Sequence, residues 1–464
     1  MTIPFIGQAY QDRSIPVSSQ RCVNWYPEVE PGEARNPITL KSAAGVAAYQ
    51  SFGSLSVRGM RYVEILDLLF VVMGPSLYSV DRSGTVTELG AISGNGLVAM
   101  DDSGTQLAIA AGNAYIYDQD QGLTLQTELG QVIDVTFQDG YFLFVNEIQP
   151  GLANQFKLTG FFNGRVFDPV DVQGAITTSD KAVGIEQCNG RIWLFSQNSY
   201  GVWANTGSSD FPFGPISSAS FNNFGLAGTH AKVVADSDIY WCGSDGRIYK
   251  TEGYGPRRVS HYGIENSIRT YSKIDDCEAF QWIENGHRFI AFVFPTGGQA
   301  WVYDSTSGLW HERSSGVNGG LWNVRFVEKA FDKTIVGDRS TPRLGMFDLD
   351  IFTEYGEMMR ARRTTPVLNA NQAPVFLPRL ELVFEVGRSS GVPDPKARLA
   401  WSNNFGVTYK NPVWRSLGNV GEYNQRATWR MIGEARNRTF DLQITDSVPR
   451  TLIAVRGEPE AGQI

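Results

Sequence analysis

Cysteine and histidine are both scarce in this chain of 464 residues, which has four of each. The cysteines lie far apart with no Cys-x-x-Cys spacing, which argues against a disulfide framework and predicts reduced, half-buried thiols. The histidines stand about 25 to 30 residues apart, and no pair has the spacing of metal ligands. We therefore expect no metal site and no cofactor. The residues concerned are Cys22, Cys188, Cys242, Cys277, His230, His261, His287 and His311.

Familiar catalytic motifs are also missing. The sequence has no Gly-x-Ser-x-Gly elbow, no phosphate-binding Gly-x-x-x-x-Gly-Lys-Ser/Thr loop and no His-Glu-x-x-His pair. Carboxylates are plentiful, but most fall in turns, where Asp caps the turn backbone. We expect no catalytic residue and no enzyme activity.

Long apolar runs are absent as well. The most apolar stretch, Ile65 to Met73, is too short to span a bilayer and contains Asp67. Met1 to Gln20 has neither the basic nor the apolar region of a secretory signal. We expect a soluble protein that is made in the cytosol and inserts into no membrane.

What the sequence does have is a repeated pattern of short apolar strands and tight turns. Asp-Gly, Asn-Gly and Ser-Gly turns recur along about three hundred residues, and such dipeptides supply the positive φ angles of tight hairpins. This recurrence in blocks of roughly 30 to 40 residues predicts an all-β fold with a β-propeller. Seven blades are expected, with six or eight left open, over residues 62–92, 98–130, 132–160, 183–207, 231–260, 277–315 and 319–356.

The pattern divides the chain into three parts. Residues 1–54, interrupted by five prolines, are expected to form an extended N-terminal arm. Residues 55–356 form the propeller, with an aromatic loop from Ser208 to Thr229. Residues 357–464 contain strands with one charged face and predict a C-terminal β-sandwich-like domain. No segment has a convincing helical period.

Charge separates the last part from the rest. Residues 357–464 contain 15 Lys and Arg against 10 Asp and Glu, whereas the preceding residues contain 25 against 38. An acidic body with a basic end predicts two different interaction surfaces, although ordinary scatter is the alternative.

Candidate assembly contacts follow from the basic and aromatic residues. Arginines beside aromatics are favoured by both subunit interfaces and nucleic-acid surfaces, so composition alone does not separate the two. The aromatic pair in the arm must pack against the chain's own propeller or against a neighbouring subunit. The candidates are Trp25, Tyr26, Arg360, Arg362, Arg363, Arg426, Arg430, Arg436 and Arg438.

One local motif predicts a hairpin. The segment from Ser402 to Tyr409 follows the Asp-box pattern Ser-x-Asp-x-Gly-x-Thr-Trp, with Asn404 in place of Asp and Tyr409 in place of Trp. Ser402, Asn404, Gly406, Thr408 and Tyr409 are therefore expected to hold a β-hairpin turn. The role is structural, and the motif says almost nothing about sugar cleavage.

At its two ends and in one late blade, the chain resembles a known family. The segments that carry the resemblance are 15–17, 20–27, 277–280, 301–304, 310, 400–406, 417–426, 428–433, 435–442 and 445–446. Together they look like the packaged-DNA stabilization proteins, also called tail accessory or tail nozzle proteins, of short-tailed bacteriophages. The sequence departs from the family's hairpin at Asn404 and Phe405, which affects the turn and leaves the assignment unchanged.

The resemblance implies a structural virion protein of the phage tail, made in the bacterial cytoplasm. Such proteins form a sixfold ring below the portal and adaptor proteins, with a tail needle or tailspikes nearby. The ring retains packaged DNA and forms part of the ejection channel, through which double-stranded DNA passes without specific binding. Two alternatives remain from the sequence: a glycan-binding or glycan-cleaving propeller that engages a receptor, and a cellular propeller scaffold.

Overall fold

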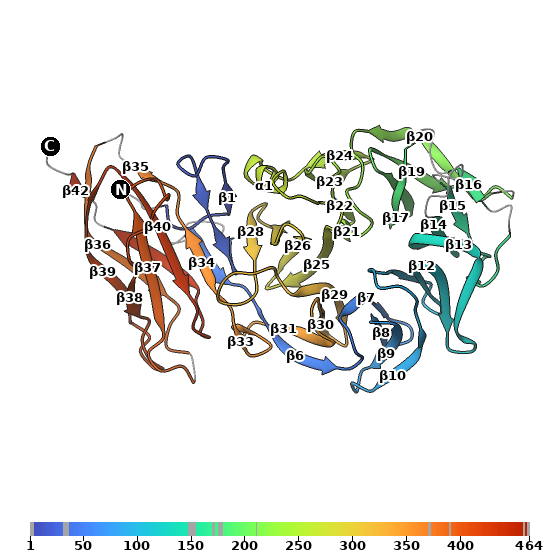
Figure 1. Cartoon of the computed structure of the whole chain (residues 1–464), viewed down its shortest axis with the longest axis horizontal. Coiled ribbons are helices and arrows are strands. Elements are labelled where there is room, and N and C mark those ends of the chain that lie inside the picture. Colours follow the sequence, from blue (N-terminus) through green and yellow to red (C-terminus); the bar gives the residue numbers. More distant parts are fainter. Residues whose placement is uncertain are drawn as a thin grey trace.

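The computed structural model describes residues 4–30, 37–146, 155–168, 172–174, 180–209, 211–369, 373–388, 391–457 and 460–461. Over these residues the chain forms a seven-bladed β-propeller with a β-sandwich beside it along the long axis (Figure 1). The predicted propeller with seven blades and a C-terminal sandwich is confirmed. One short helix, α1 (Tyr262–Ile268), departs from the expectation of no helix, because seven residues are too few to show a period.

The blades follow one another along the chain as meanders. Blade 1 contains β7 (Val57–Val63), β8 (Leu68–Met73), β9 (Ser76–Asp81) and β10 (Val86–Ala91). Blades 2 and 3 form one sheet of β11 (Ala99–Asp102), β12 (Leu107–Asp118), β13 (Gly122–Gln138), β14 (Tyr141–Asn146), β15 (Gln155–Leu158) and β16 (Val172–Gly174). The start of β13 pairs with β12 and its end pairs with β14, so this strand belongs to both blades.

Blade 4 contains β17 (Ala182–Cys188), β18 (Arg191–Ser196), β19 (Ser199–Asn205) and β20 (Phe213–Asn222). Blade 5 contains β21 (Lys232–Ala235), β22 (Asp238–Cys242), β23 (Ile248–Glu252) and β24 (Gly255–Arg258). Blade 6 contains β25 (Glu278–Glu284), β26 (His287–Phe294), β27 (Gln299–Asp304) and β28 (Trp310–Arg313). Blade 7 contains β29 (Val324–Ala330), β30 (Lys333–Asp338), β31 (Arg343–Asp348) and β6 (Gly45–Ser51).

One prediction about a connection needs correction. The expected aromatic loop from Ser208 to Thr229 contains β20, the outermost strand of blade 4. Its Pro215 lacks an N–H donor, which an edge strand tolerates, so the segment resembles a loop in sequence. The predicted N-terminal arm contains strands that pair with both domains. Its strand β6 completes blade 7 by pairing with β31.

The rest of this N-terminal segment joins the sandwich. One sandwich sheet has the order β39 (Ala427–Ala435), β36 (Val375–Phe384), β41 (Leu452–Gly457), β5 (Ile38–Ser42) and β4 (Trp25–Val29), with β42 (Glu460–Ala461) also on β36. The facing sheet contains β34 (Ala361–Thr364), β40 (Asn437–Ile444), β37 (Lys396–Ser402) and β38 (Val413–Ser416), with β35 (Leu368–Asn369) on β40. Short pairs are formed by β1 (Tyr10–Gln11) with β2 (Ser19–Gln20), and by β32 (Thr353–Glu354) with β33 (Glu357–Met358).

A single strand connects the two domains. β3 (Cys22–Val23) pairs in parallel with β28 of blade 6 and antiparallel with β34 of the sandwich. Blade 6 and one sandwich sheet therefore form a continuous ten-stranded sheet. The two domains are thus joined by backbone hydrogen bonds as well as by the chain itself.

The strands of blade 6 show why the sequence forms a propeller. In β26, Phe289, Ala291 and Val293 belong to the core that includes Val336 of blade 7. The alternate residues Ile290, Phe292 and Phe294 belong to the core that includes Trp241 of blade 5. Both faces of such a strand are apolar because each blade is packed between two others.

Candidate functional site

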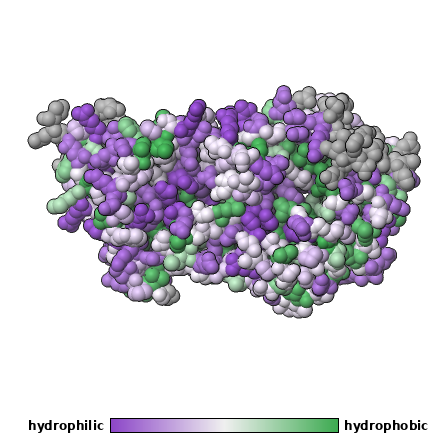
Figure 2. Space-filling model, viewed as in Figure 1, coloured by the Kyte–Doolittle hydropathy of each residue, from purple (hydrophilic) through white to green (hydrophobic). Residues whose placement is uncertain are grey.

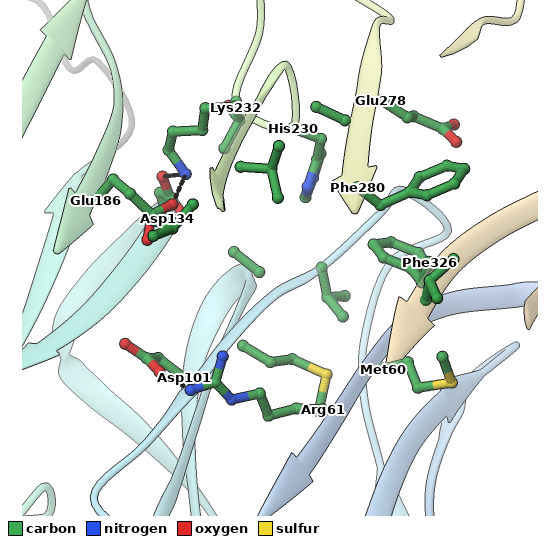
Figure 3. Close-up of a pocket in the computed structure, with 18 of the residues that line it drawn as sticks. Met60, Arg61, Asp101, Asp134, Glu186, His230, Lys232, Glu278, Phe280 and Phe326 are labelled. Carbon is green, nitrogen blue, oxygen red and sulfur yellow. Dashed lines mark ion pairs between the residues drawn. The ribbon is translucent and has the colours of Figure 1, made fainter. Parts of the chain in front are cut away.

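The innermost strand of every blade contributes to a cavity on the propeller axis. This cavity has a volume of about 310 Å³ and is lined by β7, β11, β13, β17, β21, β25 and β29 (Figure 3). At roughly 30 Å³ per water, it holds on the order of ten water molecules. A DNA duplex, whose major groove alone is about 12 Å wide, is large compared with a cavity of this volume.

Ion pairs across the axis connect neighbouring blades. Lys232 of blade 5 places Nζ 2.9 Å from Asp134 of blade 3 and 3.3 Å from Glu186 of blade 4. Burial raises the pKa of both carboxyl groups, and the lysine opposes this effect. One buried ammonium thus links three blades (Figure 3).

Further polar contacts complete the circle. Arg61 of blade 1 lies 2.7 Å from Asp101 of blade 2, whose carboxylate accepts the Phe137 amide of blade 3 at 2.7 Å. The Ala279 amide of blade 6 donates to the His230 carbonyl beside blade 5 at 2.7 Å. Arg325 of blade 7 reaches Glu278 of blade 6 at 2.9 Å and the Val57 carbonyl of blade 1 at 3.3 Å. Every blade is therefore tied to the next around the axis.

Two further titratable groups line this cavity. Burial lowers the pKa of His230 to about 4, so its ring is neutral at pH 7. Burial also raises the pKa of Glu328 to about 7. No group of three or more His, Cys, Asp or Glu side chains is placed to hold a metal ion within the described part of the chain. We therefore interpret the polar groups around the propeller axis as a candidate structural element that links the blades.

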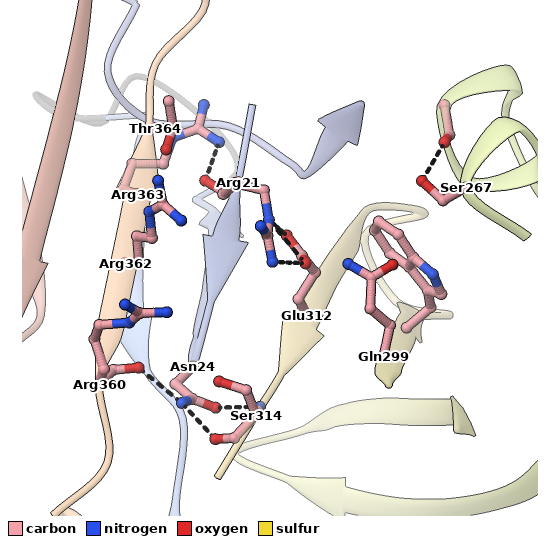
Figure 4. Close-up of polar contacts among 12 residues, drawn as sticks. Arg21, Asn24, Ser267, Gln299, Glu312, Ser314, Arg360, Arg362, Arg363 and Thr364 are labelled. Carbon is pink, nitrogen blue, oxygen red and sulfur yellow. Dashed lines mark hydrogen bonds and ion pairs between the residues drawn. The ribbon is translucent and has the colours of Figure 1, made fainter. Parts of the chain in front are cut away.

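The domain junction contains a second polar cluster (Figure 4). Arg21 forms a two-pronged ion pair with Glu312 of β28, with Nε–Oε1 at 2.8 Å and Nη2–Oε2 at 2.6 Å. The side-chain amide of Asn24 donates to the carbonyls of Ser314, at 2.9 Å, and Arg360, at 2.8 Å. These bonds hold β3 between the propeller and the sandwich.

Four of the predicted assembly contacts are enclosed by this same chain. Trp25 is 0% exposed and donates Nε1–H to the Arg450 carbonyl at 2.9 Å, and Tyr26 is 1% exposed. Arg363 is 0% exposed and donates to the carbonyls of Phe5 and Gln8. Arg438, at 5%, donates to backbone carbonyls of its own domain. This chain itself therefore covers these four side chains.

The other predicted arginines are more accessible. Arg362 pairs with Asp441 at 2.6 Å, and Arg360 donates to the Asn318 carbonyl at 3.2 Å. Arg426 is half exposed and lies 2.9 Å from Glu381. Arg430 and Arg436 are exposed, and no ion pair among the described residues includes them.

Sequence reasoning missed two arginines of the same surface. Arg379 and Arg456 both approach Glu381, which is buried although it lies on the outer side of the sheet. The alternation of Arg379, Leu380, Glu381 and Leu382 was the available signal, because it places the charged residues on one face.

The Asp-box-like segment forms the turn between β37 and β38. The Asn404 carboxamide accepts the Thr408 amide at 2.9 Å and donates to the Thr408 hydroxyl at 2.8 Å. Ser402 Oγ accepts the Gly406 amide at 3.0 Å. Gly406 has φ +89°, which favours glycine. The Tyr409 hydroxyl lies beside this turn, and burial raises its pKa to about 12.

No helix among the described residues is long and apolar enough to cross a membrane.

Comparisons with known proteins agree with this two-domain architecture. The family model described as Bacteriophage P22 Gp10, beta-propeller matches residues 1–352, and Bacteriophage P22 Gp10, beta-sandwich matches residues 360–458. The tail hub protein gp10 of Salmonella phage P22 is 23% identical over 443 residues, which cover 89% of each chain.

Solved structures of other proteins also match parts of this chain, with TM-scores below 0.5. The β-propeller domain of Cps50 (Swd1) from Myceliophteria thermophila has a TM-score of 0.45 and 9% identity, with 65% of this chain and 99% of that chain covered. PorZ of Porphyromonas gingivalis has a TM-score of 0.40 and 12% identity, with 72% of this chain and 44% of that chain covered. The family models span nearly the whole chain, and they confirm the resemblance seen in the sequence. The chain belongs to the bacteriophage P22 Gp10 family, with a propeller and a sandwich that each match their own family model.

Proposed function

We propose that this chain is a structural protein of a phage tail, located in the virion and made in the host cytoplasm. Copies of it form a ring, a hexamer, below the portal and adaptor proteins, where the ring retains packaged DNA and forms part of the ejection channel. The observation that carries the proposal is the match of both domains, in order, to the P22 Gp10 family.

The joined domains support this role. A ring that retains DNA under internal pressure needs subunits that do not deform. The continuous sheet through β3 and the polar links around the propeller axis make each subunit one body. Buried pairs of this kind are costly to break, because removal of one partner leaves an uncompensated charge.

The closed propeller axis bears on the path of the DNA. The cavity of about 310 Å³ admits no duplex, so the channel of the proposed ring lies between subunits. The acidic body would present negative charge to that channel, so that DNA slides without sticking. Exchange of exposed body carboxylates for lysine should then slow ejection; unchanged ejection kinetics would contradict this channel lining.

The test of the proposed function uses particles assembled without this chain. Heads that package DNA and then release it to added nuclease are the expected result, and the wild-type gene supplied in trans should restore protection. Heads that keep their DNA but fail to adsorb to cells would overturn the retaining role. Glycan recognition at the tail would then become the leading function.

A further inference from the structure

The outer face of one sandwich sheet gathers four arginines around one carboxylate. We call this surface the arginine face; it consists of Arg379, Arg426, Arg430 and Arg456 around Glu381. Arg379 pairs in register with Arg430, and Glu381 pairs with Arg456 and Thr428. The alternate residues Leu380, Leu382 and Trp429 are buried in the sandwich core. The arginines therefore project away from that core.

The arginine face has more positive charge than its carboxylate can neutralise. Glu381 accepts hydrogen bonds from Arg379 and from Arg426, the latter at 2.9 Å, and Arg456 lies 4.0 Å away. Burial alone would raise the pKa of Glu381, but the bonds from Arg379 and Arg426 outweigh it and lower the pKa. The three arginine side chains remain 45–50% exposed, whereas Glu381 is 4% exposed. Their guanidinium groups are oriented and still open to a second carboxylate.

Two apolar side chains extend this surface. Met431 is 89% exposed and has φ +56°, in a bulge of β39 opposite β36. Phe376 of β36 is 37% exposed, next to Glu434 in the sheet register. A non-glycine residue with positive φ costs energy and is often retained at functional sites. On the face of the molecule seen in Figure 2, hydrophilic residues are widespread and the apolar patches are small.

The composition of the arginine face favours a protein partner over nucleic acid. Arginine, methionine and aromatic residues are enriched in protein interfaces, where lysine is depleted. The four cations of this face are all arginine. A carboxylate-rich protein surface fits this arrangement, because each guanidinium can bind a carboxylate with two parallel hydrogen bonds.

Four carboxylates lie in turns on one face of this chain's own propeller. In a meander, the turns after the first strands of all blades lie on the same face. Those turns contain Asp67, Asp139, Asp236 and Asp332, with φ between 49° and 61°. Asp332 is 90% exposed on its side chain, and Arg82 must serve both Asp332 and Asp67. Asp236 pairs with Arg288, while Asp139 accepts a bond from Asn205. We call these four residues the acidic turn face.

We propose that the arginine face of one copy binds the acidic turn face of the next copy. The two patches are unlike, so the contact is heterologous, and a heterologous contact produces a closed ring when the rotation between successive copies closes. This inference rests on the proposed function, because it specifies how the ring of tail subunits is held together. The aspartates of the turns supply the carboxylates, and Met431 and Phe376 supply apolar area beside them.

Charge reversal in assembling phage tests the contact. Arg430 is the first target, because it is exposed and no ion pair of the described residues includes it. Particles produced with only Arg430→Glu, or only Asp332→Arg, should contain at least tenfold fewer copies of the chain, measured by quantitative mass spectrometry. A chain with both changes should restore incorporation, since the charges are exchanged across the contact. Arg436→Glu, an exposed sandwich arginine beyond β39, is the matched control and should incorporate normally.

Each other outcome overturns the proposal. Normal incorporation of Arg430→Glu together with Arg456→Glu would show that the arginine face is not a ring contact. If Arg430→Glu reduces incorporation and no charge reversal at Asp139, Asp236 or Asp332 restores it, the arginine face binds another tail protein or DNA. If the wild-type chain is absent from purified tails, the proposed function itself is refuted. This outcome differs from failure of the contact, in which the wild-type chain is present in tails. Circular dichroism of each purified variant confirms that it is folded.

Discussion

His287 offers a sharp test of how the two domains are held together. Its ring is 5% exposed and lies between two carboxylates, with Nδ1 2.8 Å from Asp304 and Nε2 2.5 Å from Glu28. Asp304 belongs to blade 6, whereas Glu28 belongs to β4 of the sandwich sheet. The hydrogen bond to Asp304 raises the pKa of His287, burial opposes it, and the bond to Glu28 raises it further, to about 9. The doubly protonated ring can donate to both carboxylates at once.

The pKa shift predicts how stability depends on pH. The folded pKa lies above the unfolded value of 6.5, so the stabilisation is fully present below pH 6.5 and is lost as the pH rises through about 9. Between pH 7 and pH 8 the folded chain keeps this proton while the unfolded chain has lost most of it. Each pH unit is worth at most about 1.4 kcal/mol per proton, and integration over this interval gives about 1 kcal/mol.

The assay is urea unfolding at pH 7 and pH 8, followed by tryptophan fluorescence. The free energy of unfolding should fall about 1 kcal/mol more for the wild type than for His287→Gln, which keeps a polar side chain but does not titrate. His230→Gln is the control, because burial lowers the pKa of His230 to about 4 and its folded-state proton is already lost. The interval stays below the ordinary pKa of cysteine, so the buried thiols contribute little. If the free energy of unfolding depends on pH equally in the wild type and in His287→Gln, the proposed stabilisation by His287 between Asp304 and Glu28 is refuted.

Three further substitutions test other contacts by the same unfolding measurement. Arg450→Met should destabilise the chain by about 2 kcal/mol or more, because this buried guanidinium donates to backbone carbonyls that would lose their partner; an unchanged midpoint would contradict this. Lys232→Met should cost about 3 to 5 kcal/mol, because Asp134 would remain buried without its cation, and the loss should shrink as the pH falls. Asn404→Ala should cost about 1 kcal/mol through the lost bond to the Thr408 amide, and Asn404→Asp should restore it.

The blades were predictable because their signals are local. Asp139, Asn189 and Asn285 each precede glycine in a two-residue turn, and all three adopt the positive φ that such turns require. The N-terminal strands were not predictable, because β3, β5 and β6 pair with strands hundreds of residues later and the sequence does not indicate those partners. A short strand with a distant partner has no turn beside it to mark its register.

The candidate assembly contacts show the same limit of prediction from sequence. Arg362 and Arg363 are adjacent, yet Arg363 faces the core at 0% exposure while Arg362 pairs with Asp441 near the surface. Both residues are arginine, so only the register of β34 between β3 and β40 decides which side chain is enclosed. The sequence could therefore locate the basic segment but could not assign its residues to interior or surface.

The strand β3, which joins the domains, is synthesised long before the residues that it contacts. Arg21 and its partner Glu312 are 291 residues apart, and Asn24 and Arg360 are 336 apart. At about 5 to 20 residues per second, a ribosome needs on the order of 20 to 70 s to produce the second partner. During that time Val23, Trp25 and Tyr26, which end up buried, have no completed surface to cover them. Each subunit therefore emerges with its first segment uncovered until its last segment has been made.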